Sequence, residues 1–506
     1  MKRSSTAHWV LAAGIGISFT YACSASSPLD KTATSRAAVS DGWDATPFPP
    51  PSTPVPDSPL TDQSRNLEEV LEWGTLSEAD CTHYFAGQTD TTTTLRCGKW
   101  MFFYWNNNIP GSPQGLVDLI RHNAPKTVGT SLEKLGMIPD PTSTTGLPVG
   151  LVQGPVMPGG VQTYSVTCSG CHFGQTPDGR YVAGQPNYKF AFNKYVLANS
   201  VLPLAAANPF EKLAPEVEKV LGPIRDEVFA NPFNRLSVIG QLIDLIPDLI
   251  VTQPKQPDST AMLHLAVNGT GVLDPYSTPS IDDGVTCPVK ISPLYGIDPA
   301  AMTAAGSTHG AMLSGSGGQP DLQHVLRTFA YVSGAIRKLP LGPNYDPAQV
   351  EPLIKYIMSL KPPVNPNMPN QAAVAAGADL FRQQCFGCHD GPAFAGTTVF
   401  DPTVIGTDPN IAKMLDPNHT GTALDQAVTP PELTYGVRAR RLPGIWAWTR
   451  FFHNGELTTL EEVFCLNGPR PASPAYDGHS TAGHMYTCEG LTTDQKQNLI
   501  AFLKSL

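Results

Sequence analysis

The sequence contains few charged side chains, no cluster of basic residues beyond its start, and no internal apolar run suited to crossing a bilayer. Asp, Glu, Lys and Arg make up 15% of the 506 residues, and the formal net charge is -10. Nucleic acids and acidic membrane surfaces attract clustered Lys and Arg, so the sequence argues against both and leaves a basic partner protein open. The apolar residues 236–251 include Asp244, Pro247 and Asp248, which disfavour a membrane span.

Proline is abundant where charge is scarce. The chain has 50 prolines, and 41% of its residues are hydrophobic. A chain of this length exceeds what one hydrophobic core organises, so we expect at least two domains. The composition favours a mainly α-helical protein with long irregular loops.

The N-terminus is typical of an export signal. Two basic residues precede an apolar stretch, residues 9–21, that is too short to span a membrane stably. The small residue before Cys23 resembles a bacterial lipoprotein cleavage site, but Thr20 stands where an aliphatic residue is usual, so lipidation of Cys23 and simple cleavage both fit. We expect a signal peptide over 1–23, a disordered tether rich in Pro, Ser and Thr over 24–62, and a periplasmic or surface-lipoprotein location.

The strongest motif is Cys-x-x-Cys-His, which occurs at Cys168/Cys171/His172 and again at Cys385/Cys388/His389. With 10 Cys and 12 His in the chain, chance predicts about 0.005 such matches. Two thiols one helical turn apart add to the two vinyl groups of one haem, and the adjacent histidine becomes the proximal iron ligand. A zinc site or a thioredoxin-like pair would not explain the histidine in both copies. The sequence therefore predicts two covalently bound haem c groups.

A weak internal repeat accompanies the two motifs. Residues 351–360 and 495–506 are both amphipathic, and each follows one Cys-x-x-Cys-His. A terminal helix of this kind packs across the first helix of a cytochrome c domain. We therefore expect an N-terminal accessory region over 63–160, a cytochrome c-like haem domain over 161–361 and a second one over 371–506.

The remaining cysteines suggest disulfides, because an exported protein folds in an oxidising compartment. Proximity in sequence favours pairing Cys81 with Cys97 and Cys465 with Cys488, and it leaves Cys287 single.

What occupies the sixth position of each iron separates an enzyme from an electron carrier. A second His or Met gives a low-spin carrier, whereas an open position admits peroxide or oxygen. Spacing alone selects no residue from the downstream candidates. For the second haem these are His419, His453, His479, His484, Met414 and Met485, and for the first they are His264, His309, His324, Met262, Met302 and Met312.

The run from Arg438 to Leu460 resembles the signature of the di-haem cytochrome c peroxidase superfamily, closest to the branch that contains the rubber oxygenases. Residues 147–150, 405–409 and 483–486 also resemble that branch. The resemblance implies that His484 is the distal ligand of the second haem, with His479 and Met485 next. Residues 461–467 lack the methionine of classical peroxidases, and the Trp- and Lys-rich stretch of the rubber oxygenases is missing.

The same resemblance assigns His453 and Trp446 to the reacting part of the molecule. His453 would lie at a haem edge, which is compatible with a buried structural histidine. Trp446 and Trp448 would relay electrons between the haems or simply pack in the core. Related peroxidases bind calcium between their domains, but no acidic loop here is typical of that site, so calcium is left open.

Three functions fit these features. In the first, His172 ligates a haem with an open distal face that activates peroxide or oxygen, while His389 and His484 hold a haem that transfers or stores electrons. In the second, both haems are six-coordinate and the protein only transfers electrons. In the third, a surface lipoprotein serves a partner complex. A redox partner protein and a small-molecule oxidant are expected for the first.

Overall fold

A computed structural model describes residues 60–108, 110–157, 159–207, 212–252, 259–274, 287–296, 347–396, 398–413 and 436–506. The chain divides into two compact units, 1–48 and 49–506, and every described residue belongs to the second. The predicted signal peptide, Cys23 and most of the tether lie outside the described residues. So do the candidate ligands His309, His324, His419, Met302, Met312 and Met414.

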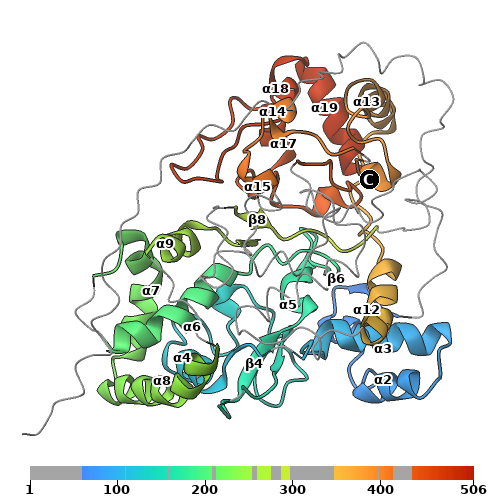
Figure 1. Ribbon diagram of the computed structural model, residues 1–506. Coiled ribbons are helices and arrows are strands. Elements are labelled where there is room, and N and C mark those ends of the chain that lie inside the picture. The colour runs from blue at the N-terminus through green and yellow to red at the C-terminus, as the bar shows by residue number, and fades with distance from the viewer. Residues whose placement is uncertain are drawn as a thin grey trace, which may run out of the picture. The chain divides into compact units, whose positions relative to one another are not determined.

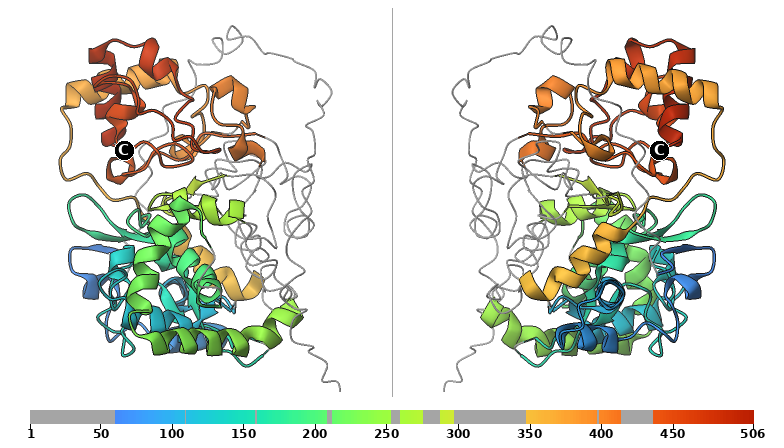
Figure 2. Two further views of the ribbon diagram at one scale, coloured as in Figure 1. Left: turned by 90° about the vertical axis from the view of Figure 1, so that its left-hand side faces the viewer. Right: turned by 90° about the vertical axis from the view of Figure 1, so that its right-hand side faces the viewer.

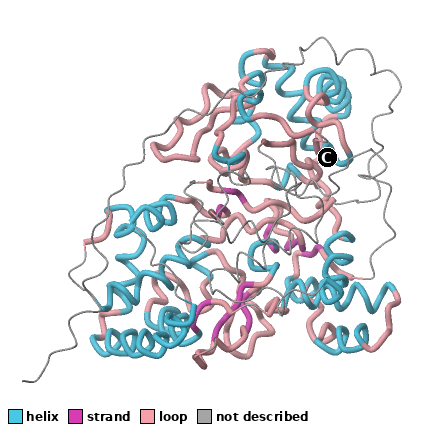
Figure 3. Tube along the Cα trace, in the orientation of Figure 1, coloured by secondary structure: helices cyan, strands magenta, loops and turns pink. Residues whose placement is uncertain are grey.

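Helices dominate the regular structure, as the composition predicted (Figure 3). The longer helices are α2 (Glu78–Phe85), α3 (Thr91–Tyr104), α4 (Gln114–Asn123), α6 (Phe192–Ala207), α7 (Pro215–Val228), α8 (Pro232–Thr252), α9 (Ser259–Val267), α12 (Pro347–Ser359), α13 (Gln371–Gln384) and α19 (Thr493–Lys504). Short helices are α1 (Leu67–Val70), η2 (Glu133–Leu135), α5 (Cys168–His172), η3 (Pro392–Phe394), α14 (Pro402–Ile405), α15 (Asn410–Lys413), η5 (Ile445–Ala447), α17 (Leu460–Val463) and α18 (Tyr486–Glu489). No helix within these segments is long and apolar enough to span a membrane.

The strands are short and form small antiparallel sheets. Their bounds are β1 (Gln63–Ser64), β2 (Ser112–Pro113), β3 (Leu151–Gln153), β4 (Thr163–Val166), β5 (Phe173–Gln175), β6 (Tyr181–Ala183), β7 (Val272–Leu273) and β8 (Val289–Lys290). The strand orders are β1-β6-β5, β2-β4-β3 and β7-β8. The first two sheets flank α5, because β4 ends just before this helix and β5 begins just after it. They fix the direction in which the chain enters and leaves the first Cys-x-x-Cys-His motif.

Helices α3 and α12 pack closely against each other in the first half of the chain. A Cβ atom on Gly98 of α3 would lie 2.1 Å from the carbonyl oxygen of Pro352, so only glycine allows the backbones to approach this closely. One turn further along, the Phe102 and Tyr356 rings meet edge to face at 5.6 Å. Helix α3, which lies in the region expected to be accessory, is therefore an integral partner of α12.

Helices α13 and α19 repeat this arrangement in the second half (Figures 1 and 2). A Cβ atom on Gly377 would lie 2.0 Å from the carbonyl oxygen of Asn498. Four residues later Phe381 packs on Phe502, with ring centroids 5.2 Å apart. Both terminal helices of the predicted repeat thus pack across a glycine-containing helix that has a phenylalanine four residues after the glycine.

The first motif helix, α5, lies between two hydrophobic clusters. Cys171 packs against a cluster built mainly by α4, α6, α7 and α9, and Cys168 packs against the cluster of α3 and α12. Thr167, the residue before α5, donates its hydroxyl hydrogen to the carbonyl of Phe103 at 3.0 Å, which ties α5 to the end of α3. Burial by both clusters holds the motif rigidly.

Both predicted disulfides are confirmed. Cys81 of α2 is bonded to Cys97 of α3, and Cys465 is bonded to Cys488 at α18. Cys287 is buried and lies outside any disulfide. The four motif cysteines are half-buried and also lie outside any disulfide. The chain therefore separates structural disulfides from the thiols of its two motifs.

Candidate functional site

The first motif presents a neutral histidine held from behind by a backbone carbonyl. Nδ1 of His172 donates to the carbonyl oxygen of Ser292 at 2.8 Å. Burial lowers the pKa of His172 to about 4 and raises the pKa of both Cys168 and Cys171 to about 12. Because Nδ1 carries the hydrogen, Nε2 keeps its lone pair for a metal. This is the orientation that a proximal iron ligand requires.

The second motif repeats this arrangement with different supporting residues. Nδ1 of His389 donates to the carbonyl oxygen of Phe394 at 2.7 Å, and burial lowers the pKa of the ring. The motif continues α13 by one turn, since the amide of Cys385 donates to the carbonyl of Phe381 at 2.8 Å. The phenylalanine at the α13/α19 crossing therefore positions both the helix pair and the motif.

A cavity of about 250 Å³ adjoins the second motif. Its lining includes Cys385, Cys388, His389 and also His484. The pKa of His484 is lowered to about 4, first by burial and then by the positive charges that His389 and Arg470 carry when protonated. The predicted proximal and distal histidines thus face one cavity, although 95 positions separate them in sequence.

Of the other described candidates for this distal position, His453 also lines the cavity, whereas His479 and Met485 do not. Nδ1 of His479 lies 2.6 Å from Oε1 of Glu456, so a carboxylate orients this ring. Met485 is 42% exposed, and its sulfur accepts a hydrogen bond from Arg470. Of the two histidines that line the cavity, His484 has His389 among the charges that act on its pKa and His453 does not, so we take His484 as the candidate for the distal ligand.

The two tryptophans of the predicted relay differ in position. Trp446 donates from Nε1 to the carbonyl of Pro363 at 2.6 Å and is not among the cavity residues. Trp448 lines the cavity, and its Nε1 donates to the hydroxyl of Tyr295 at 3.2 Å. Nζ of Lys290 lies 4.1 Å from the Trp448 ring centroid. The geometry makes Trp448, rather than Trp446, the neighbour of the cavity.

His453 lies where the resemblance suggested, at the cavity wall. It is 8% exposed, and burial lowers its pKa to about 4. Within the described part of the chain its Nε2 has no hydrogen-bond partner, and its carbonyl accepts from the amide of Lys290 at 2.6 Å. The residue is thus a neutral side chain at the cavity and a backbone support for β8.

Four cationic side chains lie at or beside the cavity. Lys290, Arg438 and Arg440 line it, and Arg441 lies next in the chain. Burial lowers the pKa of each, that of Arg441 to about 10. No salt bridge joins Lys290, Arg440 or Arg441 to a carboxylate in the described segments. The sequence analysis did not identify this cluster, although Arg438, Arg440 and Arg441 all lie at the start of the run that resembles the di-haem peroxidase signature.

Ser292 connects the cationic cluster to the first motif. Its hydroxyl accepts a hydrogen bond from Arg440, while its carbonyl accepts one from His172. Arg441 donates to the adjacent Pro293 carbonyl at 2.7 Å. Residues 290–295 therefore touch both motif regions.

The two described candidates for the first distal position lie in α9. This helix packs on α6 and α7, and Met262 belongs to that apolar cluster. His264 lies two residues further along the same helix. The cavity beside the second motif therefore contains the histidine that the sequence predicted as a distal ligand, whereas the described candidates for the first motif lie on α9.

Within the described segments, no three His, Cys, Asp or Glu side chains converge to hold a metal ion by themselves. No protein-family model matches the chain, and no curated protein matches it.

Proposed function

We propose that this protein is an exported di-haem c-type cytochrome oxidoreductase, related to the di-haem cytochrome c peroxidases, in which the first haem activates peroxide or oxygen and the second transfers or stores electrons. The observation that carries the proposal is the repeated histidine arrangement. His172 and His389 each follow a free Cys-x-x-Cys pair, and each donates Nδ1–H to a backbone carbonyl. The cavity beside His389 is also lined by His484, which the resemblance makes the distal ligand of the second haem.

The cavity residues fit a haem in three respects. The motif thiols are unpaired and one turn apart, which thioether attachment requires. Most of the wall is apolar, with Phe381, Leu442 and Phe464 among its residues. Lys290 and Arg440, which form no salt bridge in the described segments, match the carboxylates of haem propionates, because buried cations without acidic partners are costly unless an anion neutralises them.

The chain's own residues have distinct roles in this proposal. His389 and His484 would hold the second iron from two sides, and His172 would hold the first from one side. Lys290 and Arg440 would bind propionates, and Trp448 would extend the electron path towards Tyr295. Haem itself would supply one-electron iron chemistry and, at an open position, a site for a small oxidant.

The decisive experiment is spectroscopy of the protein produced with a haem-attachment system. The intact mass and the reduced pyridine spectrum should give two haems per chain. Electron paramagnetic resonance should show one high-spin and one low-spin ferric haem, and carbon monoxide should shift only the former after reduction. Two low-spin haems that respond to neither carbon monoxide nor peroxide would instead indicate a pure electron carrier.

Paired variants assign the signals. Replacing Cys168 and Cys171 by Ser should remove the high-spin signal, and replacing Cys385 and Cys388 should remove the low-spin one. The two double variants are matched because each deletes one complete attachment site. Absence of haem from the unaltered protein would refute the proposal.

A further inference from the structure

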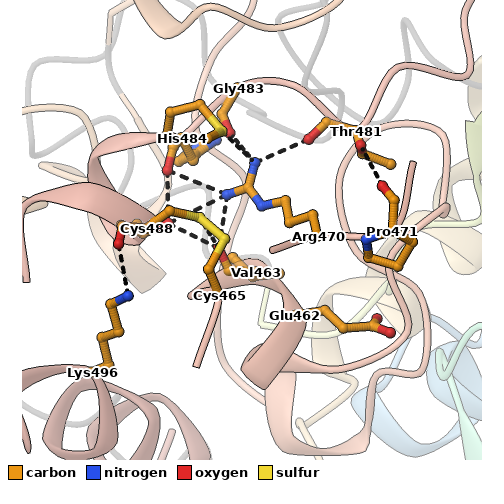
Figure 4. The surroundings of a disulfide bond; sticks show 12 residues. Glu462, Val463, Cys465, Arg470, Pro471, Thr481, Gly483, His484, Cys488 and Lys496 are labelled. Atoms are coloured by element: carbon orange, nitrogen blue, oxygen red, sulfur yellow. Dashed lines mark hydrogen bonds between the residues drawn. A yellow bond between two sulfur atoms is a disulfide. The ribbon is translucent and has the colours of Figure 1, made fainter. Parts of the chain in front are cut away.

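The guanidinium of Arg470 lies among backbone carbonyls beside His484 (Figure 4). Its Nη1 donates to the carbonyls of Thr481 and Gly483 at 3.0 and 2.5 Å. Its Nη2 donates to the carbonyls of Val463 and His484 at 2.7 and 3.3 Å. Burial lowers the pKa of Arg470, and none of the described carboxylates forms a salt bridge with it. Arg470 therefore binds the backbone carbonyls around His484 instead of a carboxylate.

The backbone at His484 needs such support. His484 has a φ of 53°, in the left-handed region that non-glycine residues seldom adopt, and it follows Gly483 with a φ of 99°. Conformations of this kind persist when surrounding contacts fix them, and they occur often at functional sites. The arginine binds the carbonyls of both residues. It therefore stabilises the turn that directs the His484 ring.

The same guanidinium also supports the ring through a neighbour. The centre of the Arg470 guanidinium lies 4.7 Å from the ring centroid of Phe452. Phe452 in turn stacks on His484, with centroids 5.7 Å apart and planes 19° from parallel. The cation, the phenylalanine and the histidine therefore form one stack, which restricts rotation of the imidazole.

The disulfide Cys465–Cys488 forms a second tether on this loop. The Val463 carbonyl accepts from Arg470 and also from the hydroxyl of Thr487 at 2.9 Å. The same hydroxyl lies 2.7 Å from the carbonyl oxygen of His484, so its one hydrogen is shared between the two carbonyls. The loop that carries His484 is consequently linked to residues 463–470 by a covalent bond and by the arginine.

We propose that Arg470 is the positioning residue that fixes His484 as the sixth ligand of the second haem. The inference rests on the proposed function, since it presupposes a haem on His389. Lysine cannot replace the planar fork, because one ammonium group cannot bind four carbonyls and also stack on Phe452. Loss of the fork should free the His484 ring and leave the sixth position open to ligands from solution.

The test compares Arg470→Lys and Arg470→Met with the unaltered protein, His484→Ala and Arg225→Lys. Arg225 is the matched control because it forms a surface ion pair with Glu218 on α7. Both Arg470 variants should lose part of the low-spin signal of the second haem. Imidazole should bind that haem at least about tenfold more tightly than in the unaltered protein, because the internal competitor is less populated. His484→Ala should show the full effect and Arg225→Lys none.

The outcomes separate the inference from the proposed function. If His484→Ala changes the second haem while both Arg470 variants match the unaltered protein in spin state and imidazole affinity, the positioning role is wrong and the haem assignment stands. If His484→Ala leaves the low-spin signal intact, the ligand assignment fails and the inference with it. If Arg470→Met does not fold, as judged by circular dichroism, Arg470→Lys decides, and the double variant Cys465→Ser/Cys488→Ser should show the same direction of change.

Discussion

The crossing of α13 and α19 makes Gly377→Ala a quantitative test of the architecture that holds the second motif. The new Cβ would lie 2.0 Å from the carbonyl oxygen of Asn498 and 2.8 Å from Cβ of Phe502. A carbon and a carbonyl oxygen normally stay about 3.3 Å apart. Since the oxygen belongs to backbone, no side-chain rotation relieves the clash, and the helices must separate by about 1 Å. The Phe381 ring, which contacts Phe502 and His389, loses part of its packing.

The magnitude follows from two opposing contributions. Overpacking of this kind costs typically about 1–3 kcal/mol, and a rigid backbone acceptor favours the upper part of that range. Alanine regains about 1 kcal/mol of helix propensity over glycine. We therefore expect Gly377→Ala to lower the free energy of unfolding by about 1–2 kcal/mol. Gly240→Ala in α8 is the control, because its Cβ would meet nothing within 4 Å, and it should raise stability by about 1 kcal/mol.

Reversible urea unfolding, followed by far-ultraviolet circular dichroism and by haem absorbance, measures both values. Gly98→Ala provides a parallel case at the α3/α12 crossing, where the new Cβ would lie 2.1 Å from the Pro352 carbonyl oxygen. A Gly377→Ala protein at least as stable as the unaltered chain would refute the close helix contact, and with it the repeated two-helix arrangement.

Three other changes test separate features. Replacing Cys81 and Cys97 together by Ser should cost about 3 kcal/mol in urea unfolding, since their bond closes a loop of 16 residues, and a loss below about 1 kcal/mol would contradict this. Trp448→Phe should slow electron transfer between the two proposed haems in stopped-flow reduction and Trp446→Phe should not, because of these two residues only Trp448 lines the cavity. Equal rates in the two variants would contradict a relay role for Trp448. Burial raises the pKa of the Glu461 carboxyl, but hydrogen bonds from a lysine of α19 and from its own backbone lower it more, so the net shift is downward. Its small contribution to the free energy of unfolding is therefore present above its ordinary pKa of 4.5 and is lost as the pH falls through the lower pKa of the folded state. Glu461→Gln should therefore change the free energy of unfolding by less than about 0.5 kcal/mol at pH 7. The two proteins should become equally stable in acid, and a difference that persists in strong acid would contradict the downward shift.

The sequence predicted the features that depend on residues close together in the chain. The Cys-x-x-Cys-His spacing identifies Cys168 and Cys385 as members of motifs whatever the fold, because the chemistry needs thiols one turn apart. The disulfides followed from short separations, since Cys465 and Cys488 lie 23 positions apart. The apolar stripes of α12 and α19 gave the terminal helices for a similar reason, because helical periodicity is visible within one turn or two.

What could not be predicted depends on residues that are distant in sequence. Helix α3 was assigned to an accessory region because nothing in residues 91–104 indicates that Gly98 meets a backbone 254 positions later. Trp446 and Trp448 cannot be told apart from the sequence, because their partners, the Pro363 carbonyl and the Tyr295 hydroxyl, lie 83 and 153 positions away. Lys290 carries no motif at all, and only the folded structure brings it to the Trp448 ring.

The bridge formed by residues 290–295 bears on how the two motifs work together. Lys290 touches the cavity of the second motif, while the carbonyl of Ser292 holds His172 of the first. The Ser292 hydroxyl accepts a hydrogen bond from Arg440, a cation that lines the second cavity. The carbonyl of the same serine accepts the hydrogen bond that orients His172. Arg440 and Ser292 therefore form a continuous hydrogen-bonded connection between the second cavity and the first motif, which neither motif sequence indicates.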